Sequence, residues 1–328
     1  MKLFRTIGLA LWSLLCPLSL WAATDAEVSA GGRMPGPLSL MLDAAGTVAD
    51  GAGVAALPDA MALYRNPASV PFASHRAAIG YSGAWLADDF SWHALTGFYR
   101  MDSLQSLVAG IRYGRQSPWT VAGTDEAARD LEPWRAAPSD WTIELGYAAR
   151  VSLHDAVSVT VRYIVSEQAG PLPSAGAIGF DAGWLHRTGA VGPERRTLLQ
   201  WGVRLANMGG KLDYGGTPLH QPMRISAGGL VQRTFHAVHA WQLSGEAGYR
   251  LVPSGGRDTD AVAGARYIWR ETLSAGIGWR HAFQSRTDAL SCGFRLSLRT
   301  WTLSAEKMLT ADAPIGCEAW YCSLQAAF

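Results

Sequence analysis

The sequence predicts an all-β protein, a transmembrane antiparallel β-barrel of about 14 strands. Apolar and polar residues alternate with a period of two from residue 75 onward, in segments about 10 to 14 residues long. The chain also ends on an apolar segment whose last residue is aromatic, Phe328. Strands of soluble proteins average about 5 or 6 residues, whereas strands that cross a membrane need about 9 to 11. Alternation alone also fits a soluble β-sandwich. The length of the strands is what favours the barrel.

Four segments show the alternation most clearly: 141–150, 199–206, 241–251 and 290–299. In each of them one face is apolar, as lipid requires, and the other face is small, polar or basic. An even number of strands allows the sheet to close, which removes the edge strands that lipid cannot satisfy. The pattern gives fourteen candidate strands: 75–87, 91–101, 104–116, 139–150, 154–167, 174–188, 197–207, 221–233, 239–253, 259–269, 272–282, 286–299, 300–309 and 316–328.

The ends of the candidate strands carry two further signals. Short links such as 102–103 and 270–271 are predicted to be periplasmic turns, and the long segments 117–138 and 208–220 extracellular loops. Aromatic residues recur near the strand ends, where an interfacial girdle is expected. The predicted girdle consists of Trp85, Trp92, Tyr99, Tyr113, Trp141, Tyr163, Trp184, Trp201, Trp241, Trp269, Trp279, Trp301 and Tyr321.

The composition fits an exported barrel. The chain has 36 Gly and 14 Trp, only 17% of its residues are charged, and its formal net charge is +1. Loss of Lys2 and Arg5 with a leader changes that net charge from +1 to −1. A nearly neutral chain offers no electrostatic basis for binding nucleic acid or an anionic surface. No nucleic-acid partner is therefore expected.

Residues 1–23 are predicted to be a cleaved signal peptide. Lys2 and Arg5 precede an apolar run at 7–21, and small residues follow that run. The run is shorter than the stretch of about 20 residues that a membrane-spanning helix needs. Export followed by insertion of the barrel predicts a location in the cell outer membrane.

The cysteines leave two alternatives open. Cys16 raises the alternative of a lipid anchor, but the bulky Leu15 stands where such a signal has a small residue, so cleavage without an anchor is favoured. Cys317 and Cys322 are five residues apart and would lie on opposite faces of a continuous strand. We interpret them as small apolar strand residues, and a single disulfide at the mouth of the last hairpin is the alternative.

Residues 24–74 do not alternate. They contain Gly-Gly and Pro-Gly-Pro, and then a helix-like piece at 58–64 that ends at Asn66-Pro67. This segment is too apolar for an exposed tail. We therefore predict an N-terminal hatch or plug at 24–74 that lies inside a barrel formed by 75–328.

Nine arginines are predicted to point into the barrel, roughly one for each strand. They could line a path for anions or fatty-acid carboxylates, or they could pair with the inward acids Glu144, Asp181 and Glu246. We favour pairing, since a filled interior needs compensated charges. The nine are Arg112, Arg150, Arg162, Arg204, Arg224, Arg250, Arg266, Arg280 and Arg295.

Two motifs carry a family resemblance. In 51–68 a Gly-Val-Ala turn, a Pro-Asp-Ala helix start, an aromatic residue and Asn-Pro-Ala follow one another, at Gly53, Pro58, Asp59, Ala60, Tyr64, Asn66 and Pro67. In 205–214 a loop of the form Asn-Met-Gly-x-Lys-Leu-x-Tyr contains Asn207, Gly209, Lys211 and Tyr214. Both motifs resemble the PorV/PorQ family of outer-membrane proteins, and PorV most of all. That family consists of FadL-like fourteen-stranded barrels with an N-terminal hatch, so the resemblance implies the same fold here.

The resemblance also implies a function. PorV-type barrels serve type IX secretion in Bacteroidota-like bacteria, where they bind the C-terminal signal domain of cargo at the translocon and deliver cargo to a surface attachment complex. The partners that the resemblance implies for this chain are the type IX translocon, cargo C-terminal domains and outer-membrane lipid or lipopolysaccharide. The first candidate contact is loop 117–138, and a solvated barrel loop is the alternative reading of it. Its candidate residues are Trp119, Asp125, Glu126, Arg129 and Trp134.

The residues offer no sign of catalysis. The histidines are scattered, apart from His236 and His239 three residues apart, and no cluster has metal-ligand spacing. Neither a Gly-x-Ser-x-Gly elbow nor a phosphate-binding loop occurs. We expect no catalytic, cofactor-binding or metal site, although a lipopolysaccharide deacylase activity is associated with PorV-like proteins. The alternatives to a secretion role are a FadL-like channel for hydrophobic compounds and, third, a lipid-modifying enzyme.

Overall fold

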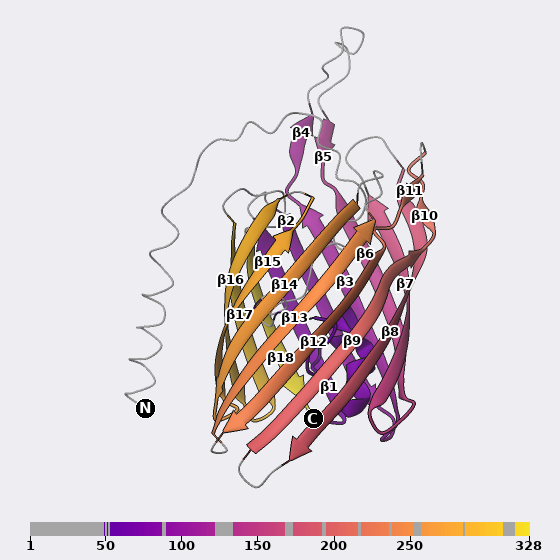
Figure 1. Ribbon diagram of the computed structural model, residues 1–328. Coiled ribbons are helices and arrows are strands. Elements are labelled where there is room, and N and C mark those ends of the chain that lie inside the picture. The colour runs from indigo at the N-terminus through magenta and orange to yellow at the C-terminus, as the bar shows by residue number, and fades with distance from the viewer. Residues whose placement is uncertain are drawn as a thin grey trace. The chain divides into compact units, whose positions relative to one another are not determined.

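Fourteen antiparallel strands close into one barrel (Figure 1). The predicted signal peptide, the first part of the predicted hatch, and Asp125, Glu126, Arg129 and Cys317 lie outside the residues that the structure describes. The computed structural model describes residues 49, 51, 53–86, 90–121, 134–167, 173–191, 195–215, 218–235, 238–251, 257–284, 286–310 and 319–328.

Each barrel strand pairs with its neighbours along the wall, and β1 pairs with β18 to close the ring. The predicted number of strands is confirmed, and the predicted boundaries agree with the observed ones to within three residues. The barrel strands are β1 (Ala77–Leu86), β2 (Phe90–Arg100), β3 (Gln105–Gln116), β6 (Ser139–Arg150), β7 (Asp155–Glu167), β8 (Ala175–Val191), β9 (Arg195–Gly209), β12 (Arg224–Phe235), β13 (His239–Leu251), β14 (Arg257–Trp269), β15 (Leu273–Ala282), β16 (Thr287–Leu298), β17 (Trp301–Thr310) and β18 (Ala319–Ala327).

The period-two pattern separates the outer face from the inner face. On β6, Ile143 and Leu145 are 60% and 55% exposed, whereas Thr142 and Glu144, which alternate with them, are 0% and 2% exposed. The apolar side chains therefore point outward, where lipid rather than a second sheet covers them. Closure is what makes this arrangement stable, because every backbone group in the wall finds its partner within the sheet.

The two ends of the barrel differ. Tight turns, such as those at 101–104 and 270–272, lie at one end, where the backbone of the terminal Phe328 bonds to that of Ala77. Arg270 and Glu271 have φ values of 52° and 57°, the left-handed values of a tight turn in which the Thr272 N–H donates to the Trp269 carbonyl at 3.0 Å. The long connections lie at the other end. We call these the turn end and the loop end.

Two small ribbons occupy the loop end. One is formed by β4 (Trp119–Val121) with β5 (Trp134–Ala136), and it stands above the barrel strands in Figure 1. The other is formed by β10 (Lys211–Leu212) with β11 (Leu219–His220). Both ribbons lie in segments that the sequence predicted to be loops without strands.

The girdle prediction is wrong for two residues, Trp92 and Tyr321. They are 0% and 3% exposed and point into the barrel, whereas Trp85 and Trp241 face outward. Directly paired residues of neighbouring strands point to the same face of the sheet. Trp92 and Tyr321 both pair with Ala84, a buried residue of β1 that points inward. A position near a strand end does not by itself determine which face carries the side chain.

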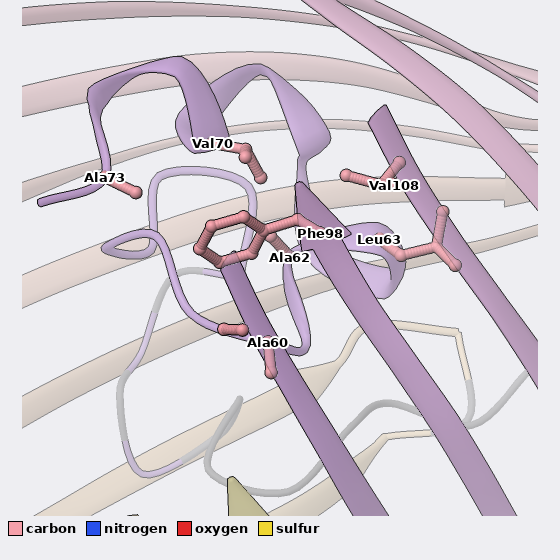
Figure 2. Packing of buried hydrophobic residues seen from close by; sticks show 8 residues of the cluster. Ala60, Ala62, Leu63, Val70, Ala73, Phe98 and Val108 are labelled. Atoms are coloured by element: carbon pink, nitrogen blue, oxygen red, sulfur yellow. The ribbon is translucent and has the colours of Figure 1, made fainter. Parts of the chain in front are cut away.

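The segment 53–73 lies inside the barrel, and we call it the plug. It contains α3 (Ala62–Arg65) and the 3₁₀-helix η3 (Pro67–Phe72). The helix predicted at 58–64 is shorter than expected, since residues 56–59 are irregular before it. Plug side chains pack against β1, β2 and β3 in the apolar cluster of Figure 2, which contains Ala60, Ala62, Leu63, Val70, Ala73, Ala78, Phe98 and Val108. No helix among the described residues is long and apolar enough to cross a membrane.

Candidate functional site in the barrel interior

Inward side chains of the wall hydrogen-bond to the backbone of the plug and of the residues just before it. Acceptors from the wall meet N–H groups of this segment between residues 49 and 60, and donors from the wall meet its carbonyl groups between residues 55 and 73. The acceptors are Glu306 of β17 to Ala49 N (2.9 Å), Glu246 of β13 to Val54 N (2.8 Å) and Gln325 of β18 to Ala60 N (3.1 Å).

The donors come from β2, β8 and β9. Two of them, Arg100 and Arg187, hold the last turn of the plug. The bonds are Gln200 Nε2 to the carbonyls of Ala55 and Ala56 (both 2.9 Å), Arg204 Nη1 to those of Tyr64 and Arg65 (2.7 Å for Arg65), Arg187 to that of Phe72 (3.0 Å) and Arg100 to that of Ala73 (2.6 Å). Together with the acceptors, six strands of the wall hold this segment by its main chain.

Glycines in the wall allow the plug to approach this closely. A β-carbon on Gly202 would lie 2.8 Å from the carbonyl oxygen of Val54, and one on Gly80 would lie 2.9 Å from Cβ of Ala60. A β-carbon on Gly183 would overlap with Oδ1 of Asn66. Glycine is therefore required where the two backbones meet. The high glycine content of the chain follows in part from this contact.

A buried ion-pair chain crosses the wall from β3 to β9. Arg112 bonds to Glu144 through Nε at 2.6 Å, and Arg162 lies 3.4 Å from the other oxygen of Glu144. Asp181 then pairs with both Arg162 and Arg204. The predicted pairing with Glu144 and Asp181 is confirmed. The guanidinium groups satisfy acids here, so they do not line an open path for anions.

A second group of charges lies on β12 to β15. Arg224 Nη2 is 3.3 Å from Glu246 and 3.1 Å from Asp260, and Arg280 Nε is 3.6 Å from Asp260. The predicted partner Glu246 is confirmed, and it is the same residue that accepts the Val54 N–H of the plug. Breaking such a buried pair leaves an uncompensated charge, which costs about 3–5 kcal/mol.

The residues of the first motif lie in and around the plug. Asn66 bonds to Val54 and Trp184, Pro67 begins η3, and Asp59 pairs with Arg65 at 2.8 Å. The backbone N–H of Ala60 donates to Gln325, and the Gly53 carbonyl accepts a hydrogen bond from Ala56. Pro58 lies in the irregular segment before α3. Tyr64 lies between Trp92 and Arg112.

Tyr64 connects the plug to the charged part of the wall. Its ring meets the Trp92 ring edge-on at 6.2 Å, and the Arg112 guanidinium lies over it at 4.7 Å. Burial, with a smaller contribution from Glu144, raises the pKa of the Tyr64 hydroxyl above its ordinary value, so the hydroxyl is neutral. Among the described residues, neither this hydroxyl nor Nε1 of Trp92 has a hydrogen-bond partner.

The second motif forms a structure that covers part of the inner wall. Asn207 has φ of 58°, and its backbone N–H donates to Asp181 at 2.8 Å. Gly209 passes so close to the Ile178 carbonyl that a side chain would clash, and Lys211 is exposed in β10. The side chains of Tyr214 and Leu212 pack against inward residues of β7 and β8, namely Ile164, Ala175 and Ala177. The motif is therefore a structural element, with Lys211 at its surface.

A continuous apolar surface lies nearer the loop end, and we call it the apolar strip. It consists of Leu86, Phe90, Trp92, Met308, Ala319 and Tyr321, each at most 7% exposed. The register makes the strip continuous: Leu86 is opposite Ala319, which is opposite Met308. On β1 and β18 these positions are farther toward the loop end than Gly80 and Gln325, which touch the plug. This surface was not predicted from the sequence, because the positions of Trp92 and Tyr321 near strand ends indicated the outer girdle.

The candidate contact residues of loop 117–138 are only partly described. Trp119 and Trp134 belong to the β4–β5 ribbon, where Trp134 pairs with Val121. Asp125, Glu126 and Arg129 lie outside the described residues. Among the described residues, no group of three or more His, Cys, Asp or Glu is placed to hold a metal ion, and Cys292 and Cys322 are free thiols.

No family model matches the sequence, and no curated protein matches it. Solved structures do share the fold. The toluene transporter TbuX of Ralstonia pickettii has a TM-score of 0.53 at 12% identity, covering 88% of this chain and 99% of that chain. The monoaromatic hydrocarbon channel CymD has a TM-score of 0.52 at 11% identity, covering 88% and 97%. The toluene transporter TodX of Pseudomonas putida has a TM-score of 0.50 at 10% identity, covering 87% and 97%.

At sequence identities of 10–12%, the similarity between this chain and the three solved structures concerns the fold. The chain is a closed fourteen-stranded β-barrel of the outer-membrane type with a FadL-like fold. The three similar structures are transporters or channels for hydrocarbons. None of the three is a secretion protein, so the PorV resemblance rests on the two sequence motifs alone.

Proposed function

We propose that this protein is an outer-membrane channel for small hydrophobic compounds. The proposal rests on the apolar strip, a run of buried apolar and aromatic side chains on the loop side of the plug contacts. Sites for apolar ligands are lined mainly by hydrophobic and aromatic side chains, with few polar groups. The three hydrocarbon transporters and channels that share the fold support the same substrate class here.

Passage of a compound requires the plug to move, since six strands hold the segment it belongs to. Each of the hydrogen bonds that hold it contributes only about 0.5–1.5 kcal/mol net, so a local rearrangement of a few bonds is accessible. Among the described strand pairs, the register shifts at one place, between Phe180 and Ala182 where β8 meets β9. Two neighbouring strands separate with the smallest loss of backbone hydrogen bonds where their pairing is irregular. We therefore place the exit route beside Asp181 and Asn207.

Uptake of radiolabelled toluene tests the channel. The full chain is produced in the outer membrane of a host that lacks hydrocarbon channels, and initial uptake is compared with cells that carry an empty vector. We expect several-fold faster uptake of toluene and unchanged uptake of a sugar of similar size, since the charged wall is filled by the plug. Equal toluene uptake with and without the barrel would exclude the proposal.

A second candidate function is docking in type IX secretion, and the β4–β5 ribbon favours it. The ribbon stands above the barrel at the loop end (Figure 1), and Trp119 and Trp134 are two of its strand residues. Tryptophan is enriched among the residues that dominate protein interfaces. A barrel whose plug is bonded from many sides also suits a protein that works through its loops.

Affinity isolation from detergent-solubilised outer membrane of the native host tests docking. The full chain and a variant in which Trp119 and Trp134 are both replaced by Ala are compared. Docking predicts that the full chain recovers a very large barrel translocon or cargo with type IX C-terminal domains, and that the variant does not. Recovery of neither by the full chain would leave the channel as the sole candidate.

A further inference from the structure

The outer surface of the barrel carries a depression at the turn end. It has a volume of about 650 Å³ and is lined by Phe235, His239, Trp241 and Tyr267. These residues belong to the last part of β12, the first part of β13 and the last part of β14. The depression is therefore on the lipid-facing side, outside the interior that the proposed channel uses.

The strand register explains why these side chains gather. Trp241 lies opposite Tyr267 in one row across the strands, and Phe235 lies opposite His239 in the next row toward the turns. The Trp241 and Tyr267 rings are 4.9 Å apart, and Nδ1 of His239 is hydrogen-bonded to the Tyr267 hydroxyl at 2.5 Å. The aromatic walls are thus fixed to one another by ring contacts and a hydrogen bond.

Two arginines lie next to residues that line the depression or that pair with them. Arg233 lies opposite Trp241 in the same row, is exposed, and has its guanidinium over the Phe235 ring at 5.1 Å. Arg270, in the adjoining turn, has its guanidinium over the Trp269 ring at 5.0 Å. One acid, Glu271, is exposed beside Arg270. Arg233 and Arg270 therefore place two permanent cations, and Glu271 one anion, in the neighbourhood of the depression.

An outward arginine in a membrane strand is costly at the bilayer midplane and nearly neutral close to the interface. Arg233 lies two residues from the end of β12, so its charge lies close to the interface. A guanidinium that is stacked on an aromatic ring keeps its donors free for a phosphate, which it binds bidentately. Aromatic side chains at the same level suit the start of an acyl chain and the glycerol region.

We infer that this depression is a binding site for one anionic glycerophospholipid in the leaflet at the turn end of the barrel. Arg233 and Arg270 bind the phosphate, and the rings of Phe235, Trp241 and Tyr267 hold the glycerol and the first part of the acyl chains. A general aromatic girdle does not account for the arrangement, because it requires neither a depression nor an arginine stacked on a ring at each side of it.

Native mass spectrometry of the full chain in detergent tests the site. The purified barrel is incubated with phosphatidylglycerol, or with diacylglycerol that has the same acyl chains and no phosphate. We expect one phosphatidylglycerol to be retained in preference to diacylglycerol. Each lost guanidinium should reduce retention about five-fold, so R233Q and R270Q each lower it and the double variant lowers it further.

Arg299→Gln is the matched control, since Arg299 is exposed in the turn between β16 and β17 at the same end of the barrel. It should leave retention unchanged. Heat-modifiable migration on gels shows whether each variant is a folded barrel. The variant Arg233→Lys keeps the positive charge and should therefore retain more lipid than R233Q. Equal retention by the double variant and the parent would overturn the inference, as would equal retention of diacylglycerol or stronger retention of lipopolysaccharide.

Discussion

Nδ2 of Asn66 donates a hydrogen bond to the carbonyl of Trp184 on β8, 3.1 Å away, and so joins the plug to the wall through one side chain. The same amide group donates to the carbonyl of Val54 at 3.0 Å, while Oδ1 accepts from Ala68 N at 3.2 Å and caps η3. Asn66 therefore fixes three points at once, and the Asn-Pro-Ala sequence of the first motif has a structural explanation.

Gly183→Ala tests this attachment. The added methyl group would overlap with Oδ1 of Asn66 and would lie 2.6 Å from the hydroxyl of Ser158, so Asn66 must leave its place. We expect a loss of about 1–3 kcal/mol in the free energy of unfolding, as in other overpacked sites, and a higher ion conductance in planar bilayers. Gly245→Ala is the control, since its nearest neighbouring atom would be 3.6 Å away. Identical conductance of the two variants would contradict the role of Asn66.

Glu144→Gln tests the buried ion-pair chain. The substitution removes the negative charge between Arg112 and Arg162, and both guanidinium groups are buried. Thermal or urea unfolding should show destabilisation of about 3–5 kcal/mol. Combining it with Arg112→Met removes the guanidinium that bonds to Glu144, so the double variant should be more stable than the sum of the single effects predicts. Additive losses would show that Arg112 and Glu144 are not energetically coupled.

The last turn of the plug should be the part that opens most readily at the turn end. Arg100 and Arg187 hold it through single bonds to the carbonyls of Ala73 and Phe72. In the double variant R100Q/R187Q the backbone amide hydrogens of 68–73 should therefore exchange with solvent faster than in the parent protein. Exchange in the barrel strands should stay unchanged. Arg115→Gln, at an exposed position at the loop end of β3, is the control. Unchanged exchange in 68–73 would mean that other contacts hold this turn.

Much of the barrel was predictable because a lipid-facing strand has a strict pattern. Alternation in segments such as 141–150 determined the face of every residue, and strand length distinguished lipid from a second sheet. The same parity placed arginines and acids on one face, so the pairs of Glu144, Asp181 and Glu246 could be predicted without knowing the register. Charges inside a filled interior must be paired, which leaves few alternatives.

The interior surface was less predictable for physical reasons. Trp92 and Tyr321 were assigned by their distance from strand ends, although parity with the buried Ala84 would have placed them inside. The contacts of Gly80, Gly183 and Gly202 with the plug depend on which strand each plug residue meets, and no local pattern carries that information. The lipid-facing hollow likewise depends on three strands being in register, so it becomes visible only in the folded barrel.

Substitution of Trp92 tests the apolar strip as the surface that selects compounds. Trp92 is the fully buried member of the strip that meets Tyr64, so Trp92→Ala should enlarge the interior there, at a cost of about 3–5 kcal/mol in stability. The enlarged space should favour larger compounds, so the ratio of naphthalene to toluene uptake should rise about three- to ten-fold. A ratio is used because it does not depend on how much folded barrel each strain contains.

Trp85→Ala is the matched control, since Trp85 lies at the same end of the barrel but is 45% exposed on the outer face. It should leave the uptake ratio unchanged, and Trp92→Phe, which keeps an aromatic ring, should change it less than Trp92→Ala. If both tryptophan variants shift the ratio equally, the effect comes from altered contact with lipid and the strip does not select the compound. If neither shifts it while toluene still enters, the compound takes a route that bypasses the strip, since removal of a buried indole from the path must change what fits there.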